Sequence, residues 1–130
     1  MKNLAQLHGT HKEIMSELQF LNVELRFLIS LIKKEYNNAS SQKQVKLLDA
    51  YYLEFEKNIT KTDKLLSEIN DTEKNFARLT KHGIVNIERT FINDEDRTSE
   101  QFGRIKNEIL LLKQSFYDFV KEELGFVVVK

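Results

Sequence analysis

Residues 62–79, TDKLLSEINDTEKNFARL, decide how many helices the chain forms. Leu66, Ile69 and Phe76 within this stretch are spaced so that they share one face of a helix. The polar run at 70–72 lies between them, but a turn there would normally shift the apolar phase, and the phase continues unshifted. The stretch therefore predicts one unbroken helix.

The same spacing of three and four residues extends in both directions and predicts three long amphipathic helices. The first helix has two possible starts, Asn3 and Thr10, each with a capping partner three residues later. The apolar phase runs through Gly9 without a break, which favours the earlier start. Gly83 and Gly125 are placed where left-handed residues would end the second and third helices. The predicted ranges are about 3–37, 41–82 and 84–124.

These helices predict an all-α fold, an antiparallel bundle of three long amphipathic helices that forms a single domain over residues 1–130. The chain contains no proline, so nothing in it obliges a helix to break. The alternative is an up-down-up-down four-helix bundle, in which 70–72 and 93–94 are true turns. In the first connection, we expect Ser40 to cap the second helix.

Composition excludes several classes of function. The 20 basic and 20 acidic residues cancel, so no concentrated basic surface points to nucleic acid or to an anionic membrane. There is no cysteine, which removes disulfides and thiolate metal sites. No apolar run approaches the roughly 20 residues of a membrane span. We expect a soluble, cytoplasmic protein with no membrane or nucleic-acid partner.

The histidines offer the one candidate metal site. Helical bundles of hemerythrin-like or ferritin-like type hold metals with Glu and His that point inward from facing helices. With turns near residues 39 and 83, His8 and His11 come level with Glu68 of the second helix and Glu100 of the third. These four side chains are the candidate ligands for Fe or Zn. The alternative is that His11 is a core histidine hydrogen-bonded to Ser67, Glu68 or Gln101, with His8 at the surface.

A second candidate surface follows from the unequal helix lengths. The first helix is expected to stop level with residues 71–76. Beyond that level, the hairpin formed by residues 76–92, the distal hairpin, has only two helices and an uncovered apolar patch. Such a patch usually marks an association surface, and a two-fold dimer is the commonest solution. The alternative is that residues 1–10 or the tail at 126–129 cover the patch. The candidate interface residues are Phe76, Leu79, Ile84, Ile87, Phe91 and Ile92.

Several short motifs carry a resemblance. They are His8-x-x-His11-Lys12, Glu17-Leu18, Glu68-Ile69-Asn70-Asp71, Ile105-x-Asn107-Glu108-Ile109 and Phe116-x-x-Phe119. Together they resemble small uncharacterised bacterial helical-bundle proteins, some of them histidine-rich. The resemblance implies a helical-bundle fold.

These observations favour a non-enzymatic protein-interaction or scaffold bundle that needs no cofactor and self-associates as a homodimer. The chain shows no phosphate-binding glycine loop and no serine nucleophile motif, which argues against hydrolase and nucleotide-binding functions. The alternative function is a metal-binding bundle that uses the histidine and glutamate ligands named above.

Overall fold

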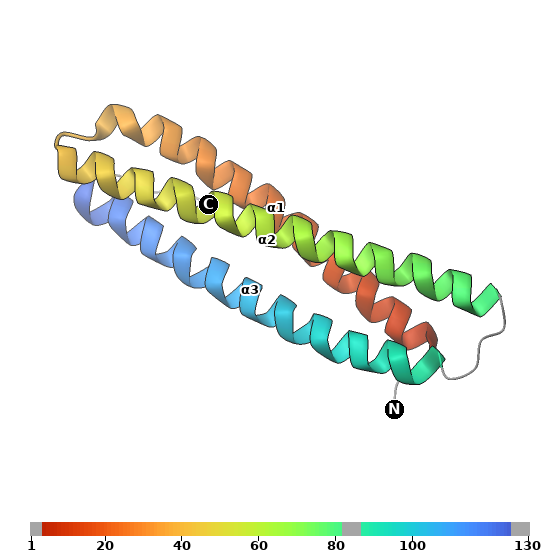
Figure 1. The fold of residues 1–130 in the computed structure, drawn as a ribbon. Coiled ribbons are helices and arrows are strands. Elements are labelled where there is room, and N and C mark those ends of the chain that lie inside the picture. Colours follow the sequence, from red (N-terminus) through yellow and green to blue (C-terminus); the bar gives the residue numbers. More distant parts are fainter. Residues whose placement is uncertain (1–3, 82–86, 126–130) are drawn as a thin grey trace.

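A computed structural model of the chain shows three long helices packed side by side along one axis (Figure 1). It describes residues 4–81 and 87–125, and within these ranges all side chains except those of residues 4, 5, 7, 80 and 87–95. The chain is all-α, and the predicted three-helix bundle is confirmed. The elements are α1 (Leu4–Glu35), the short 3-10 helix η1 (Tyr36–Asn38), α2 (Gln42–Lys81) and α3 (Ile87–Glu123).

The helix α2 runs without a break through residues 70–72, so the four-helix alternative is wrong. Ile69 is buried and keeps the apolar phase just before this run. The Thr72 hydroxyl donates a hydrogen bond to the carbonyl oxygen of Glu68, 3.0 Å away, so its polar group is satisfied within the helix. Likewise, α3 is one helix through residues 93–96.

The first connection contains a reciprocal cap, but its position differs from the prediction. The backbone N–H of Gln44 donates to the Ser41 hydroxyl at 3.2 Å, so Ser41 and not Ser40 caps α2. In return, the Gln44 side-chain oxygen accepts from the Ser40 amide at 2.7 Å. After the carboxyl end of α3, Gly125 has a φ of 72°, which confirms the predicted glycine stop. The predicted stop at Gly83 lies outside the described residues.

A tyrosine fastens the same connection to α2. The hydroxyl of Tyr36, in η1, donates a hydrogen bond to the carboxylate of Asp49. This bond, followed by burial and the nearby negative charge, raises the pKa of Tyr36 to about 12. The bond therefore holds the end of α1 against α2 throughout the neutral pH range.

The core consists of two apolar clusters that follow each other along the bundle. The larger cluster joins all three helices near the first connection, and its Phe55 and Phe116 rings meet edge to face at 5.4 Å. Each such buried side chain contributes roughly 1.5 to 3 kcal/mol by leaving water. The larger cluster is Leu25, Leu28, Ile32, Leu48, Phe55, Ile109, Phe116, Phe119 and Val120, and the smaller is Ile14, Leu18, Leu65 and Ile69.

Buried polar side chains of α2 lie between the two clusters. Asn58 and Thr62 are both fully buried. The Thr62 hydroxyl donates to the Ile59 carbonyl at 2.8 Å and accepts from the side-chain amide of Asn22, in α1, at 2.9 Å. The Asn58 amide nitrogen donates to the Glu54 carbonyl at 2.9 Å. The core is therefore interrupted by a short polar layer.

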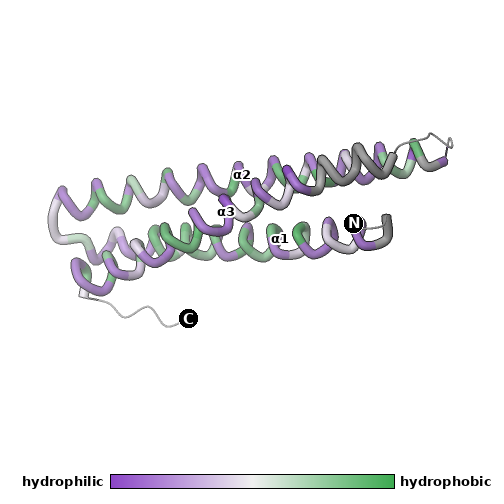
Figure 2. Tube along the Cα trace, turned by 90° about the horizontal axis from the view of Figure 1, so that it is seen from below, coloured by the Kyte–Doolittle hydropathy of each residue, from purple (hydrophilic) through white to green (hydrophobic). Residues whose placement is uncertain are grey.

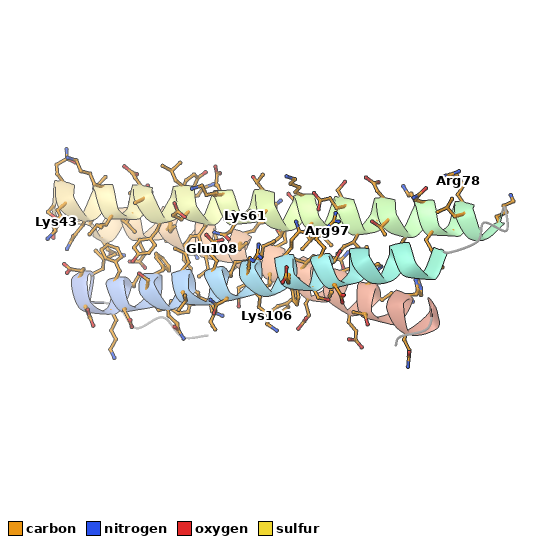
Figure 3. The ribbon with its side chains drawn as sticks, turned by 60° about the horizontal axis from the view of Figure 1, so that its bottom comes forward. Lys43, Lys61, Arg78, Arg97, Lys106 and Glu108 are labelled. Carbon is orange, nitrogen blue, oxygen red and sulfur yellow. The ribbon has the colours of Figure 1, made fainter. Side chains whose placement is uncertain are left out.

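The register of α2 against α3 agrees with the prediction, whereas that of α1 against α2 is shifted. Lys61 and Glu108 meet at 2.7 Å between α2 and α3 (Figure 3), within about one helical turn of the predicted alignment. His11, in contrast, contacts Glu73, several residues beyond the predicted Glu68. The cause is the first connection, which carries the chain outward past the end of α1 before α2 begins (Figure 1).

Candidate interaction surface

His8 and His11, near the start of α1, contact one carboxylate of α2. The Nδ1 atom of His8 lies 2.9 Å from Oε2 of Glu73, and the Nδ1 atom of His11 lies 2.7 Å from Oε1 of the same residue. The His11 ring is buried, whereas His8 is exposed. The buried His11 and exposed His8 agree with the alternative prediction of a core histidine. The predicted partner is wrong, because the shifted register places Glu73 at the His11 ring in place of Ser67, Glu68 or Gln101.

The two predicted carboxylate ligands lie elsewhere. Glu68 lines a groove between α2 and α3 together with Gln101 and Arg104. Glu100 is exposed and lies 3.6 Å from Arg104. Within residues 4–81 and 87–125, as far as side chains are described, no group of three or more His, Asp or Glu is arranged to hold a metal ion. The structure thus brings together the two histidines but not the four predicted ligands.

The Glu73 contact makes a testable contribution to stability. We expect Glu73→Ala to lower the free energy of unfolding by about 1 kcal/mol, because the buried His11 ring loses a hydrogen-bond acceptor. The control is Glu68→Ala, which removes an exposed carboxylate from the same helix and should change the free energy by no more than about 0.5 kcal/mol. Urea denaturation followed by circular dichroism measures both. Equal effects would show that the histidine contact contributes nothing specific.

The structure describes the predicted distal interface only in part. Phe76 and Leu79 are half-buried on α2. Ile84 lies outside the described residues, as do the side chains of Ile87, Phe91 and Ile92, so this interface stays a prediction. The length mismatch behind it is smaller than predicted, because α1 is shifted along α2 so that His11 lies beside Glu73 and not Glu68. The first turns of α1 therefore lie beside the start of α3 (Figure 1).

A different apolar surface is present on the outer face of α1. Phe20 is 67% exposed, Val23 66% and Phe27 52%, and their spacing places them together on the face opposite the core. Figure 2 shows hydrophobic positions recurring at short intervals along the middle of α1. Single exposed apolar residues are ordinary, but a contiguous stripe with two phenylalanines indicates an association surface.

An apolar groove of about 480 Å³ adjoins this stripe between α1 and α3. Phe20 and Leu21 line it from α1, and Ile109 and Leu110 line it from α3. Leu110 is 46% exposed, so the stripe continues across the groove onto the second helix. We define the α1–α3 face as Phe20, Val23, Phe27, Leu110 and the groove between them.

An ion pair lies at each end of the groove, and in both pairs the glutamate belongs to α1 and the lysine to α3. Glu17 of α1 lies 3.3 Å from Lys106 of α3, and Glu24 lies 3.3 Å from Lys113. The second pair is mostly buried. Burial, with a contribution from the Glu24 carboxylate, also raises the pKa of the neighbouring Tyr117. The α1 wall of the groove is therefore acidic and the α3 wall basic.

The other two large grooves have more polar linings. The groove between α1 and α2 contains Arg26, Lys33 and Glu56, and the groove between α2 and α3 contains three cationic side chains and two glutamates. The α1–α3 groove also has four charged lining residues, but its exposed lining is mostly apolar, whereas polar atoms form a larger part of the other two linings. The fully buried centre of a protein interface is more apolar than the rest of the surface. The α1–α3 face is thus the best candidate for association among the described surfaces.

The α1–α3 face was not predicted from the sequence, although the sequence contains a signal for it. Phe20, Val23 and Phe27 are one, two and one positions away from the nearest residues of the α1 core stripe, and they share their own face at steps of three and four. A helix with apolar residues on two opposite faces buries more than one of them, or presents one to a partner. That second stripe is visible in the sequence once the core stripe has been assigned.

Comparisons with known proteins add no relative. No family model matches the chain, and neither a curated protein nor a solved structure shows significant similarity to it. Within the described residues, no helix is both long enough and apolar enough to span a lipid bilayer.

Proposed function

We propose that this protein is a non-enzymatic interaction bundle that acts as a scaffold by self-association. The observation that supports the proposal is the α1–α3 face, where Phe20, Val23 and Phe27 are each more than half exposed beside an apolar groove. Two phenylalanines in water on a well-formed helix have a free-energy cost that association removes. The distal hairpin predicted from the sequence is a second surface for the same function.

The alternative, a metal-binding bundle, has less support. It requires several carboxylates beside His8 and His11, and Glu73 is the carboxylate that contacts both of them. Elemental analysis of natively purified protein separates the two functions. Stoichiometric Fe or Zn that disappears in the His8→Ala, His11→Ala double variant would favour the metal-binding bundle.

Sedimentation velocity tests self-association and its location. We expect wild type to dimerise in the micromolar range and Phe20→Glu to weaken the dimer at least tenfold, because a charge would have to be buried. Leu53→Glu is the matched control, since Leu53 is 65% exposed on α2, which does not line the α1–α3 groove. Circular dichroism checks that each variant stays helical.

A third variant distinguishes the two surfaces. If Phe91→Glu dissociates the dimer and Phe20→Glu does not, association occurs through the distal hairpin and the α1–α3 face is wrong. A wild type that stays monomeric at high micromolar concentration would contradict the proposed function itself.

A further inference from the structure

The two ion pairs across the groove fix how α1 and α3 are aligned. Glu17 and Lys106 are 89 residues apart in the chain, and so are Glu24 and Lys113. Because both pairs have the same sequence separation, α1 and α3 run in the same direction, and residues 89 positions apart lie at the same height along the bundle axis. Figure 1 also shows the parallel direction of the two helices. By the same separation Phe20 is level with Ile109, and its height therefore matches that of the neighbouring Leu110.

The charges of the face are separated between its two helices. Glu17 and Glu24 lie on the α1 side of the groove, while Lys106 and Lys113 lie on the α3 side, one heptad apart in each case. In Figure 3, Lys106 lies on the side of α3 away from α2. It lines the groove between α1 and α3. Apolar contacts between these charges do not favour one orientation of a partner over another, so the charged side chains decide how a partner aligns.

Two copies that meet through the same face are related by a two-fold axis lying in that face. If the axis runs across the helices, α1 meets the α1 of the partner, and glutamates oppose glutamates while lysines oppose lysines. If the axis runs along the bundle, α1 meets the α3 of the partner, and each acidic wall opposes a basic wall at the same height. The charge pattern is self-complementary in the second arrangement alone.

We infer that the occupant of the α1–α3 face is a second copy of this chain, related by a two-fold axis parallel to the bundle. This inference rests on the proposed function and adds the partner and its orientation. Phe20 of each copy packs on the partner's Leu110 and covers the groove. The ion pairs within each chain then become four-charge networks, in which every glutamate has lysines of both copies nearby.

Spin-label distances test the orientation. The chain has no cysteine, so Lys43→Cys introduces one labelling site, at an exposed position of α2 that does not line the groove. Lys43 lies about 20 residues along the helix from the height of the groove, or roughly 30 Å. With a parallel axis, both labels lie at the same end, separated by roughly 30 to 40 Å, the width of two bundles. With an axis across the helices, they lie on the order of 60 Å apart.

Charge exchange gives an independent test. Glu17→Lys with Glu24→Lys makes both walls basic, and Lys106→Glu with Lys113→Glu makes both walls acidic. We expect each double variant to dimerise at least tenfold more weakly than wild type and a one-to-one mixture to form a heterodimer. Restored association in the mixture also shows that both variants remain folded.

The outcomes separate this inference from the proposed function. A dimer that Phe20→Glu dissociates, with labels about 60 Å apart, would refute the parallel axis and leave self-association intact. Double variants that dimerise as well as wild type would show that the walls do not align the copies. A monomeric wild type would overturn both the orientation and the function.

Discussion

Replacing Leu25 with alanine is expected to lower the free energy of unfolding by about 2 to 5 kcal/mol. Leu25 is fully buried in the larger apolar cluster, together with Phe55, Ile109 and Phe116. The substitution removes three carbon atoms from a position where all three helices meet. The loss combines the apolar surface that is no longer buried with the cavity that the rigid neighbours leave open.

The chain supplies a matched control for this substitution. Leu53→Ala deletes the same atoms from α2, but Leu53 is 65% exposed, so its loss should stay within about 0.5 kcal/mol. Urea denaturation monitored by circular dichroism at a single temperature measures both variants. Similar losses at the two positions would mean that the α1 stripe is not the centre of the core.

The helices were predictable because their signals are long and mutually consistent. The stripe through Ile14, Leu18, Leu25 and Ile32 gives the buried face of α1, and the structure confirms it. Absence of proline let each stripe run for many turns, which outweighed the local preference of the polar run at 70–72 for a turn.

The position of α1 along α2 could not be derived in the same way. Each stripe fixes which face of a helix is buried, but sliding one helix along another by a full turn keeps the same faces in contact. The shape of the connection at 36–41 then sets the register, and short polar loops do not reveal their direction in sequence. This is why Glu73, and not Glu68, contacts His11.

The α1–α3 face was missed for a related reason. Phe20 and Phe27 were not assigned to the core stripe, and their neighbours across the groove depend on a register that sequence leaves open. Only the packed structure places Leu110 beside Phe20 and the lysines opposite the glutamates.

The second large effect concerns the buried amide of Asn58. Its nitrogen donates to the Glu54 carbonyl, but its Oδ1 atom has no hydrogen-bond partner among the described residues. A buried acceptor left in this state loses its hydration without compensation, at a cost of roughly 1 to 3 kcal/mol. Asn58→Leu removes that atom and joins the two apolar clusters. We therefore expect the variant to be more stable than wild type by about 1 to 3 kcal/mol.

Thr62→Val is the control, because it also removes a buried polar group from the same layer. The Thr62 hydroxyl is satisfied by Ile59 and Asn22, so its loss should destabilise the bundle by about 0.5 to 1.5 kcal/mol. Opposite signs for the two variants, measured by urea denaturation, would confirm the difference between them. A less stable Asn58→Leu would show that Oδ1 has a bonding partner in solution.

If Asn58→Leu is more stable than wild type, Asn58 does not serve stability, and its role would be to select one register of the helices. Buried asparagines in coiled coils fix register at a cost in stability, because misaligned helices leave the amide against apolar side chains. Here the apolar stripes alone permit α1 to slide along α2 by one helical turn. The polar layer of Asn58, Thr62 and Asn22 interrupts the otherwise apolar core and so distinguishes one register from the next. We expect Asn58→Leu to populate more than one register, seen as doubled amide resonances in two-dimensional NMR spectra. A single sharp set of resonances in this more stable variant would assign the register to the first connection and the Glu73 contact instead.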